Sequence, residues 1–179
     1  MTAGEAEEVA RTRKRLSPSA RKALLVVHIG VAVAWLGVDV VLGVLVLRTV
    51  VSSDPTVVAV SYQAVELFAV WTLLPLGLLT LLSGIVLGRG TRWGVLRYRW
   101  VVVKLVIAVV LTALVPLALQ PTVEAAGEYG RAMLAGEPTG ETPTNLYFPP
   151  IVSSIALVVA LVLAVYKPWG RTRRRRPAD

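Results

Sequence analysis

Four ionisable side chains interrupt stretches of sequence that are otherwise apolar, and they are the candidates for chemistry in this chain. His28 and Asp39 lie in the first stretch, Glu66 directly precedes the second, and Lys104 lies in the third. Histidine is the residue type that can titrate near neutrality without a large pKa shift, and the carboxyls of Asp39 and Glu66 can accept protons or pair with cations. These residue types suit the handling of protons, of a cation or of a redox lipid such as a quinone.

Each of these residues also has a structural interpretation. On one helix, His28 and Asp39 are about 16 Å apart and cannot touch. We expect both to face the interior of a helix bundle, with Asp39 paired to Arg48 or to a Ser or Thr hydroxyl, because an unpaired carboxyl is unfavourable in hydrocarbon. Glu66 is expected at a membrane boundary, and Lys104 is expected to extend to the lipid headgroups.

Other kinds of chemistry lack their ligands. The chain has no Cys and a single His, which excludes thiolate sites as well as a two-His metal site or a bis-His haem within one chain. It contains no phosphate-binding loop, dinucleotide fingerprint, HExxH motif or nucleophile elbow. We therefore expect no metal, no cofactor and no enzymatic activity.

Four apolar stretches must position the candidate residues. Of the 179 residues, 55% are hydrophobic, against about 45–50% in a soluble domain. Crossing a bilayer takes about 20 helical residues, and the predicted helices at about 23–47, 55–88 (apolar over 67–87), 100–119 and 150–166 are long enough. A chain of this length cannot bury four such helices on all sides. The sequence therefore predicts an all-α, polytopic membrane protein with four transmembrane helices in an up-down bundle.

Charge predicts the orientation. Sixteen of the 19 Lys and Arg residues lie before the first helix, between the second and third, or after the fourth. Because basic residues near helix ends stay in the cytoplasm, we expect a basic tail over 1–22 and an Arg-rich tail over 167–179 on that side, and an external loop over 120–149. The protein is expected in the inner (cytoplasmic) membrane, with its first helix retained as an anchor rather than cleaved as a signal peptide.

Helix boundaries and packing residues can also be predicted. Ser53-Asp54-Pro55 places a capping carboxylate before a proline, so the second helix should begin at Pro55. Proline removes a backbone donor and kinks a helix, which predicts bends at Pro75 and Pro116. Small residues mark helix contacts in membranes, and the candidates are Gly77, Gly84 and Gly88, the last two forming a G-x-x-x-G pattern.

A basic cluster follows the last helix closely, and it consists of Arg173, Arg174, Arg175 and Arg176. In isolation it resembles a nucleic-acid-binding segment, but next to a membrane it is interpreted as a contact with anionic lipid headgroups at the cytoplasmic face. The expected partners are therefore the lipid bilayer and either another membrane protein or a second copy of the chain, and no nucleic acid.

Several short motifs carry a resemblance to known proteins. They are Ala23-Leu24-Leu25-Val26-Val27-His28, Ala34-Trp35-Leu36-Gly37, Trp93-Gly94-Val95-Leu96-Arg97, Trp100-Val101-Val102-Val103-Lys104-Leu105 and Gln120-Pro121. Over about residues 17–130, the chain resembles an uncharacterised actinobacterial family of small integral membrane proteins, which implies a four-helix membrane protein. The first helix is also distantly similar to membrane proteins of the copper-resistance D type, but the chain lacks their further His and Met ligands.

Two functions remain in view. The favoured one is a non-catalytic membrane subunit or scaffold, because four helices seldom enclose a gated pathway and no ligand set is complete. The alternative is a bundle that handles protons, a cation or a quinone through His28, Asp39, Glu66 and Lys104.

The predicted topology can be tested with compartment-specific reporters. A reporter fused after Asp179 should register the cytoplasm, and one inserted at Gly140 should register the external side, because the basic residues are so unequally distributed. Activity of both reporters on one side would contradict the four-span topology.

Overall fold

The computed structural model describes residues 16–90, 95–96, 98–137 and 140–167. This part of the chain is all-helical, with four helices that are long and apolar enough to cross a membrane. The all-helical class expected from the sequence is confirmed. The elements are α2 (Pro18–Val51), α3 (Pro55–Gly90), α4 (Arg99–Leu114), the π-helix η1 (Val115–Leu119), α5 (Gln120–Ala135) and α6 (Phe148–Tyr166).

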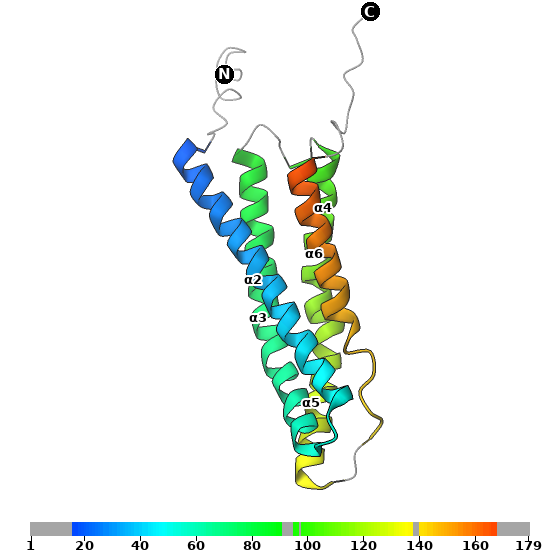
Figure 1. Cartoon of the computed structure of the whole chain (residues 1–179). Coiled ribbons are helices and arrows are strands. Elements are labelled where there is room, and N and C mark those ends of the chain that lie inside the picture. The colour runs from blue at the N-terminus through cyan, green and yellow to red at the C-terminus, as the bar shows by residue number, and fades with distance from the viewer. Residues whose placement is uncertain (1–15, 91–94, 97, 138–139, 168–179) are drawn as a thin grey trace, which may run out of the picture.

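The helices form an elongated bundle in which successive long helices run in opposite directions (Figure 1). One end, called here the terminal end, holds the start of α2 and the end of α6. The other, called the loop end, holds the α2–α3 turn and the α5–α6 connection. α3 is central, because it packs along α2, α4 and α5, while α6 packs against α2 and α4.

The turn between α2 and α3 follows from its capping residues. The Ser52 N–H donates to the Arg48 carbonyl oxygen at 3.1 Å, which closes α2. The Asp54 carboxylate then accepts a hydrogen bond from the Thr56 N–H at 2.8 Å, and α3 begins at Pro55. The predicted start of the second helix is confirmed, because an N-cap acceptor followed by a proline at the first helical position satisfies the free end of the helix.

Proline has different effects in the second and third long helices. α3 remains helical through Pro75. At Pro116, where the sequence predicts a bend, the chain widens into η1 and then continues as α5 to Ala135. Proline lacks an N–H and crowds the carbonyl four residues earlier, and one wider turn relieves both problems. The helix therefore extends well into the segment 120–149 that the sequence assigns to a loop.

α5 lies very close to α3 because it presents glycines to it. A Cβ atom added to Gly130 would lie 2.6 Å from the carbonyl oxygen of Ala59 and 3.1 Å from the Cβ of Tyr62. One added to Gly127 would collide with the carboxylate of Glu66. α5 ends at Ala135. The next residue, Gly136, has a left-handed φ of 68° and closes the helix by donating its backbone N–H to the carbonyl oxygens of Ala132 and Met133.

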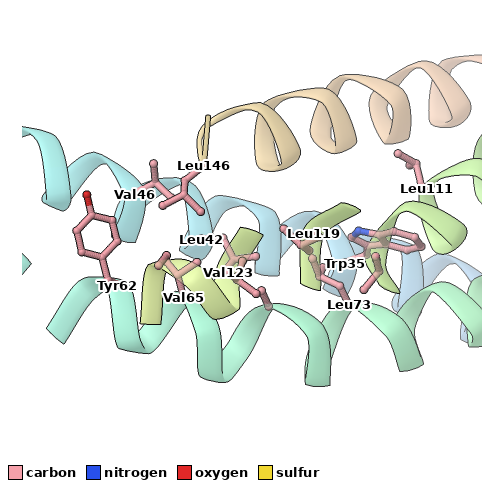
Figure 2. Packing of buried hydrophobic residues seen from close by; sticks show 13 residues of the cluster. Trp35, Leu42, Val46, Tyr62, Val65, Leu73, Leu111, Leu119, Val123 and Leu146 are labelled. Carbon is pink, nitrogen blue, oxygen red and sulfur yellow. The ribbon is translucent and has the colours of Figure 1, made fainter. Parts of the chain in front are cut away.

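The buried residues form a core cluster between the helices, toward the loop end (Figure 2). It includes Trp35 and Leu42 from α2, Leu73 from α3, Leu119 from η1 and Leu146 from the α5–α6 connection. Many large apolar side chains instead point outward, as Trp71 does with 79% of its surface exposed. An apolar exterior of this extent suits a lipid environment rather than water.

The close approach of α5 and α3 predicts the effect of a small substitution. Gly130→Ala should lower the stability of the protein by about 1–3 kcal/mol, because the new methyl group has no space against Ala59. On helix propensity alone the same change would stabilise an exposed helix by about 1 kcal/mol. The sign of the shift in thermal midpoint, measured in detergent, therefore separates the two effects.

Ala125→Leu is the matched control, because Ala125 is exposed on the same helix. It should leave the midpoint nearly unchanged. A midpoint that rises in Gly130→Ala would contradict the packing of α5 on α3.

Candidate functional site

Asp39 is the most deeply buried ionisable side chain among those that the structure describes. Only 1% of its surface is exposed, and it shares a face of α2 with Trp35, Leu42 and Val46. The prediction that Asp39 faces the bundle interior is confirmed.

Of the partners predicted for Asp39, Arg48 is wrong, whereas a serine hydroxyl, that of Ser153, lies beside the carboxyl without forming a well-aligned hydrogen bond. Within the described residues, neither carboxyl oxygen makes a hydrogen bond. The Ser153 hydroxyl of α6 is close enough to the carboxyl for a weak hydrogen bond, but the contact does not have the distance and angles of a well-formed one. Arg48 is exposed, more than two turns further along α2. A carboxyl at this depth usually has a partner, since an unsatisfied one is unfavourable by a few kcal/mol.

A cavity of about 280 Å³ explains why Asp39 lacks a protein partner. Residues from each of the four long helices line the cavity, and its walls are almost entirely apolar. Asp39 is the ionisable residue in that lining. The carboxyl therefore faces a space large enough for a small molecule or for part of a larger one.

Two further polar groups on the cavity wall are also unsatisfied. The indole Nε1 of Trp35 and the hydroxyl of Ser153 are buried and make no hydrogen bond among the described residues. Buried polar groups are bonded in the great majority of cases. Among the described residues, four of the seven unsatisfied buried side-chain atoms belong to Asp39 and these two residues on the cavity wall, and the other three belong to Gln63, Thr80 and Thr112. The cavity is therefore the candidate functional site.

The prolines of two helices shape this cavity. The wide turn at Pro116 brings Val115, Ala118 and Leu119 of η1 to one wall. The first turn of α6 contains Pro149 and Pro150, which also line the cavity. Because proline rings and a π-turn replace regular ridges, α6 cannot interlock with η1 as regular helices do.

His28 lies in the half of α2 nearer the terminal end, and α3 holds it. Its Nδ1 is 2.8 Å from the hydroxyl of Ser83. Since that hydroxyl donates to the Leu79 carbonyl oxygen at 2.6 Å, the imidazole N–H is the donor to Ser83. His28 is half-buried and does not line the cavity.

Glu66 and Lys104 also lie away from the cavity. Glu66 forms a two-pronged ion pair with Arg131 near the loop end, with N–O distances of 2.5 and 3.3 Å. The Lys104 ammonium lies 5.8 Å from the centre of the Trp100 ring, close to the terminal end, and is within electrostatic range of His28. The structure thus separates Asp39 from the other three candidate residues.

The three predicted packing glycines each lie against a neighbour. A Cβ on Gly77 would lie 2.7 Å from the Thr112 hydroxyl oxygen, and one on Gly84 would lie 3.2 Å from the His28 ring. One on Gly88 would lie 2.8 Å from a side-chain carbon of Val95. All three glycines therefore allow a close approach that a larger residue would prevent.

The predicted contact with lipid headgroups lies outside the described residues, which end at Lys167. It concerns the four arginines of the last segment, Arg173, Arg174, Arg175 and Arg176. The contact stays a prediction for each of them, because it depends on their charge and on their place after α6.

Trp35 and Ser153 are the site residues that sequence reasoning misses. The signal for Ser153 is weak, because a Ser-Ser pair at 153–154 near the start of an apolar helix is common in membrane helices. Trp35 lies four residues before Asp39, so the sequence places both on one helix face. Only the tertiary structure shows that the indole N–H of Trp35 has no acceptor among the described residues.

Within the described ranges, no three His, Asp or Glu residues lie together in a group that could hold a metal ion. Comparison with protein-family models, with curated proteins and with solved structures finds no match to this chain. The resemblance to an actinobacterial membrane family stays a prediction, and the cavity is interpreted from its own chemistry.

The unsatisfied carboxyl leads to a stability prediction. Asp39→Leu should raise the thermal midpoint of the purified, ligand-free protein, by a stabilisation of about 1–3 kcal/mol, because it removes a buried polar group that makes no well-formed hydrogen bond. Asp54→Ala provides the contrast: it should lower the midpoint, since it deletes the cap of α3. A marked loss of stability in Asp39→Leu would mean that the carboxyl has a structural partner.

Proposed function

We propose that this chain is a multi-pass protein of the cytoplasmic membrane, with both termini in the cytoplasm, that binds a lipid-soluble small molecule beside Asp39 and has no catalytic activity of its own. One observation carries the proposal: three unsatisfied polar side chains face one apolar cavity. Their hydrogen bonds are then completed by the bound molecule.

The walls of the cavity favour a lipid-soluble ligand. They consist mainly of Val, Leu and Pro side chains, and few polar atoms reach them. Ala118 and Val152, which contribute to the lining from η1 and α6, are also exposed on the outside of the helices. In a membrane-spanning bundle this outside faces lipid, so a ligand can enter from the bilayer.

The volume limits the part of the ligand that is enclosed. About 280 Å³ is just below the range of about 300–1,000 Å³ for ligand pockets. It is nearly twice the roughly 150 Å³ of an apolar cavity that holds benzene. A single substituted ring or a short head group fits, while any longer chain remains in the lipid.

The placement of the other ionisable residues supports binding rather than catalysis. His28, Glu66 and Lys104 do not line the cavity, so Asp39 has no neighbouring acid or base among the described residues with which to share a reaction. The scaffold for an unidentified membrane partner, which the sequence favours, remains a prediction. In that role the cavity would be dispensable.

The proposal can be tested by identifying what the purified protein carries. Organic extraction of the detergent-purified chain, followed by mass spectrometry, should recover one lipid-soluble species in near-stoichiometric amount. Ala118→Phe should reduce the recovery at least tenfold, because the phenyl ring occupies the cavity from η1.

Ala125→Phe is the matched control, since Ala125 is exposed on the adjoining helix and does not line the cavity. Equal recovery from both variants, or no bound species in the unmodified protein, would refute the proposed function.

A further inference from the structure

Building on the proposed function, we propose that the ligand belongs to the phenol class, with a hydroxyl on an aromatic ring held between Asp39, Trp35 and Ser153. The inference rests on the donors and acceptors that these side chains leave unused. Each of them is at least nine-tenths buried, and each lines the same cavity.

Trp35 determines what the ligand must accept. The indole N–H is a donor and cannot act as an acceptor, and its nitrogen makes no bond among the described residues. The ligand atom beside it must therefore be an acceptor. A lipophilic amine in its cationic form has only donors, so it would satisfy Asp39 and leave Trp35 unpaired.

Asp39 determines what the ligand must donate. In either protonation state, a carboxyl retains at least one oxygen that accepts a hydrogen bond. A ligand that only accepts, such as an ether or a quinone, leaves that oxygen to the poorly aligned Ser153 hydroxyl alone. A hydroxyl group donates through its hydrogen and accepts through its oxygen, so one group serves both Asp39 and Trp35.

The positions of the three side chains suit one small group. Trp35 and Asp39 are four residues apart on α2, so they lie on the same helix face about 6 Å apart along its axis. Figure 2 shows the indole nitrogen on the side of the ring that faces Leu119. Ser153 approaches from α6 and can act as donor or acceptor as the ligand requires.

The apolar lining favours an aromatic ring next to the hydroxyl. Leu42, Leu73 and Leu119 line the cavity, and the space is that of a ring with several substituents. A ring hydroxyl is carried rigidly, so little conformational entropy is lost when it is placed between two partners.

The test uses 2,3,5,6-tetramethylphenol and its methyl ether, which differ only in the donor hydrogen that the methyl group replaces. Equilibrium dialysis against the full chain in lipid nanodiscs, with empty nanodiscs as the partition control, should show saturable binding of the phenol. The ether should bind at least tenfold more weakly. In Asp39→Leu, the affinity for the phenol should fall to that for the ether, because the carboxyl acceptor is gone.

Two conservative variants separate a hydrogen bond from general packing. Asp39→Asn retains a carbonyl acceptor and should keep phenol binding within about threefold. Trp35→Phe removes the indole N–H and should weaken the binding of the phenol about five- to tenfold. Trp71→Phe is its matched control, because Trp71 is exposed and outside the cavity, and it should bind as the unmodified protein does.

The outcomes separate this inference from the function on which it rests. Equal affinity for the phenol and its ether would overturn the inference, as would saturable binding of tetradecylamine that Asp39→Asn abolishes. In both cases the cavity still binds a ligand, and the proposed function stands. Absence of saturable binding for all three probes, together with no extracted ligand, would overturn both.

Discussion

Close approach of backbones at small residues is the constraint on which the bundle depends. When the outer face of every helix is as apolar as lipid, an apolar side chain gains little by contacting another helix instead of a lipid tail. Tight packing between the helices must then hold the bundle together. Gly130 places α5 against the backbone of α3, and Gly77 leaves room for Thr112 and the Trp35 ring. The central position of α3 follows, because it meets α2, α4 and α5 through these contacts.

The cavity lies where this packing is interrupted. At η1 the helix is widened around Pro116, and α6 begins with two further prolines. Neither segment presents the regular ridges that interlock in helix pairs. The structural features that perturb the helices thus also form the cavity. Asp39 gives that space its polarity, since its buried carboxyl is part of the cavity wall.

An unsatisfied carboxyl in an apolar cavity is unfavourable for folding, and its presence is best understood through a ligand. The other charged candidates have ordinary structural explanations: Glu66 ties α3 to α5 through Arg131, and Lys104 lies over the ring of Trp100. Within the described part of the chain, the unused hydrogen-bonding capacity at the cavity is therefore what sets Asp39 apart from them. A small hydroxyl compound that dissolves in lipid would complete the site without adding net charge to the interior.

The sequence by itself determined the class of structure and its local boundaries. Hydrophobic length predicts four long helices, and Asp54 followed by Pro55 predicts the start of α3, because both depend on residues adjacent in the chain. The burial of Asp39 also follows from its setting in an apolar helix. The pairing of Glu66 with Arg131, 65 residues away, does not. The sequence also does not predict the π-turn that extends the third long helix, the cavity, or the absence of a well-formed hydrogen bond to Asp39. These depend on how α6 and η1 fit together across the bundle, and only the tertiary structure decides that fit.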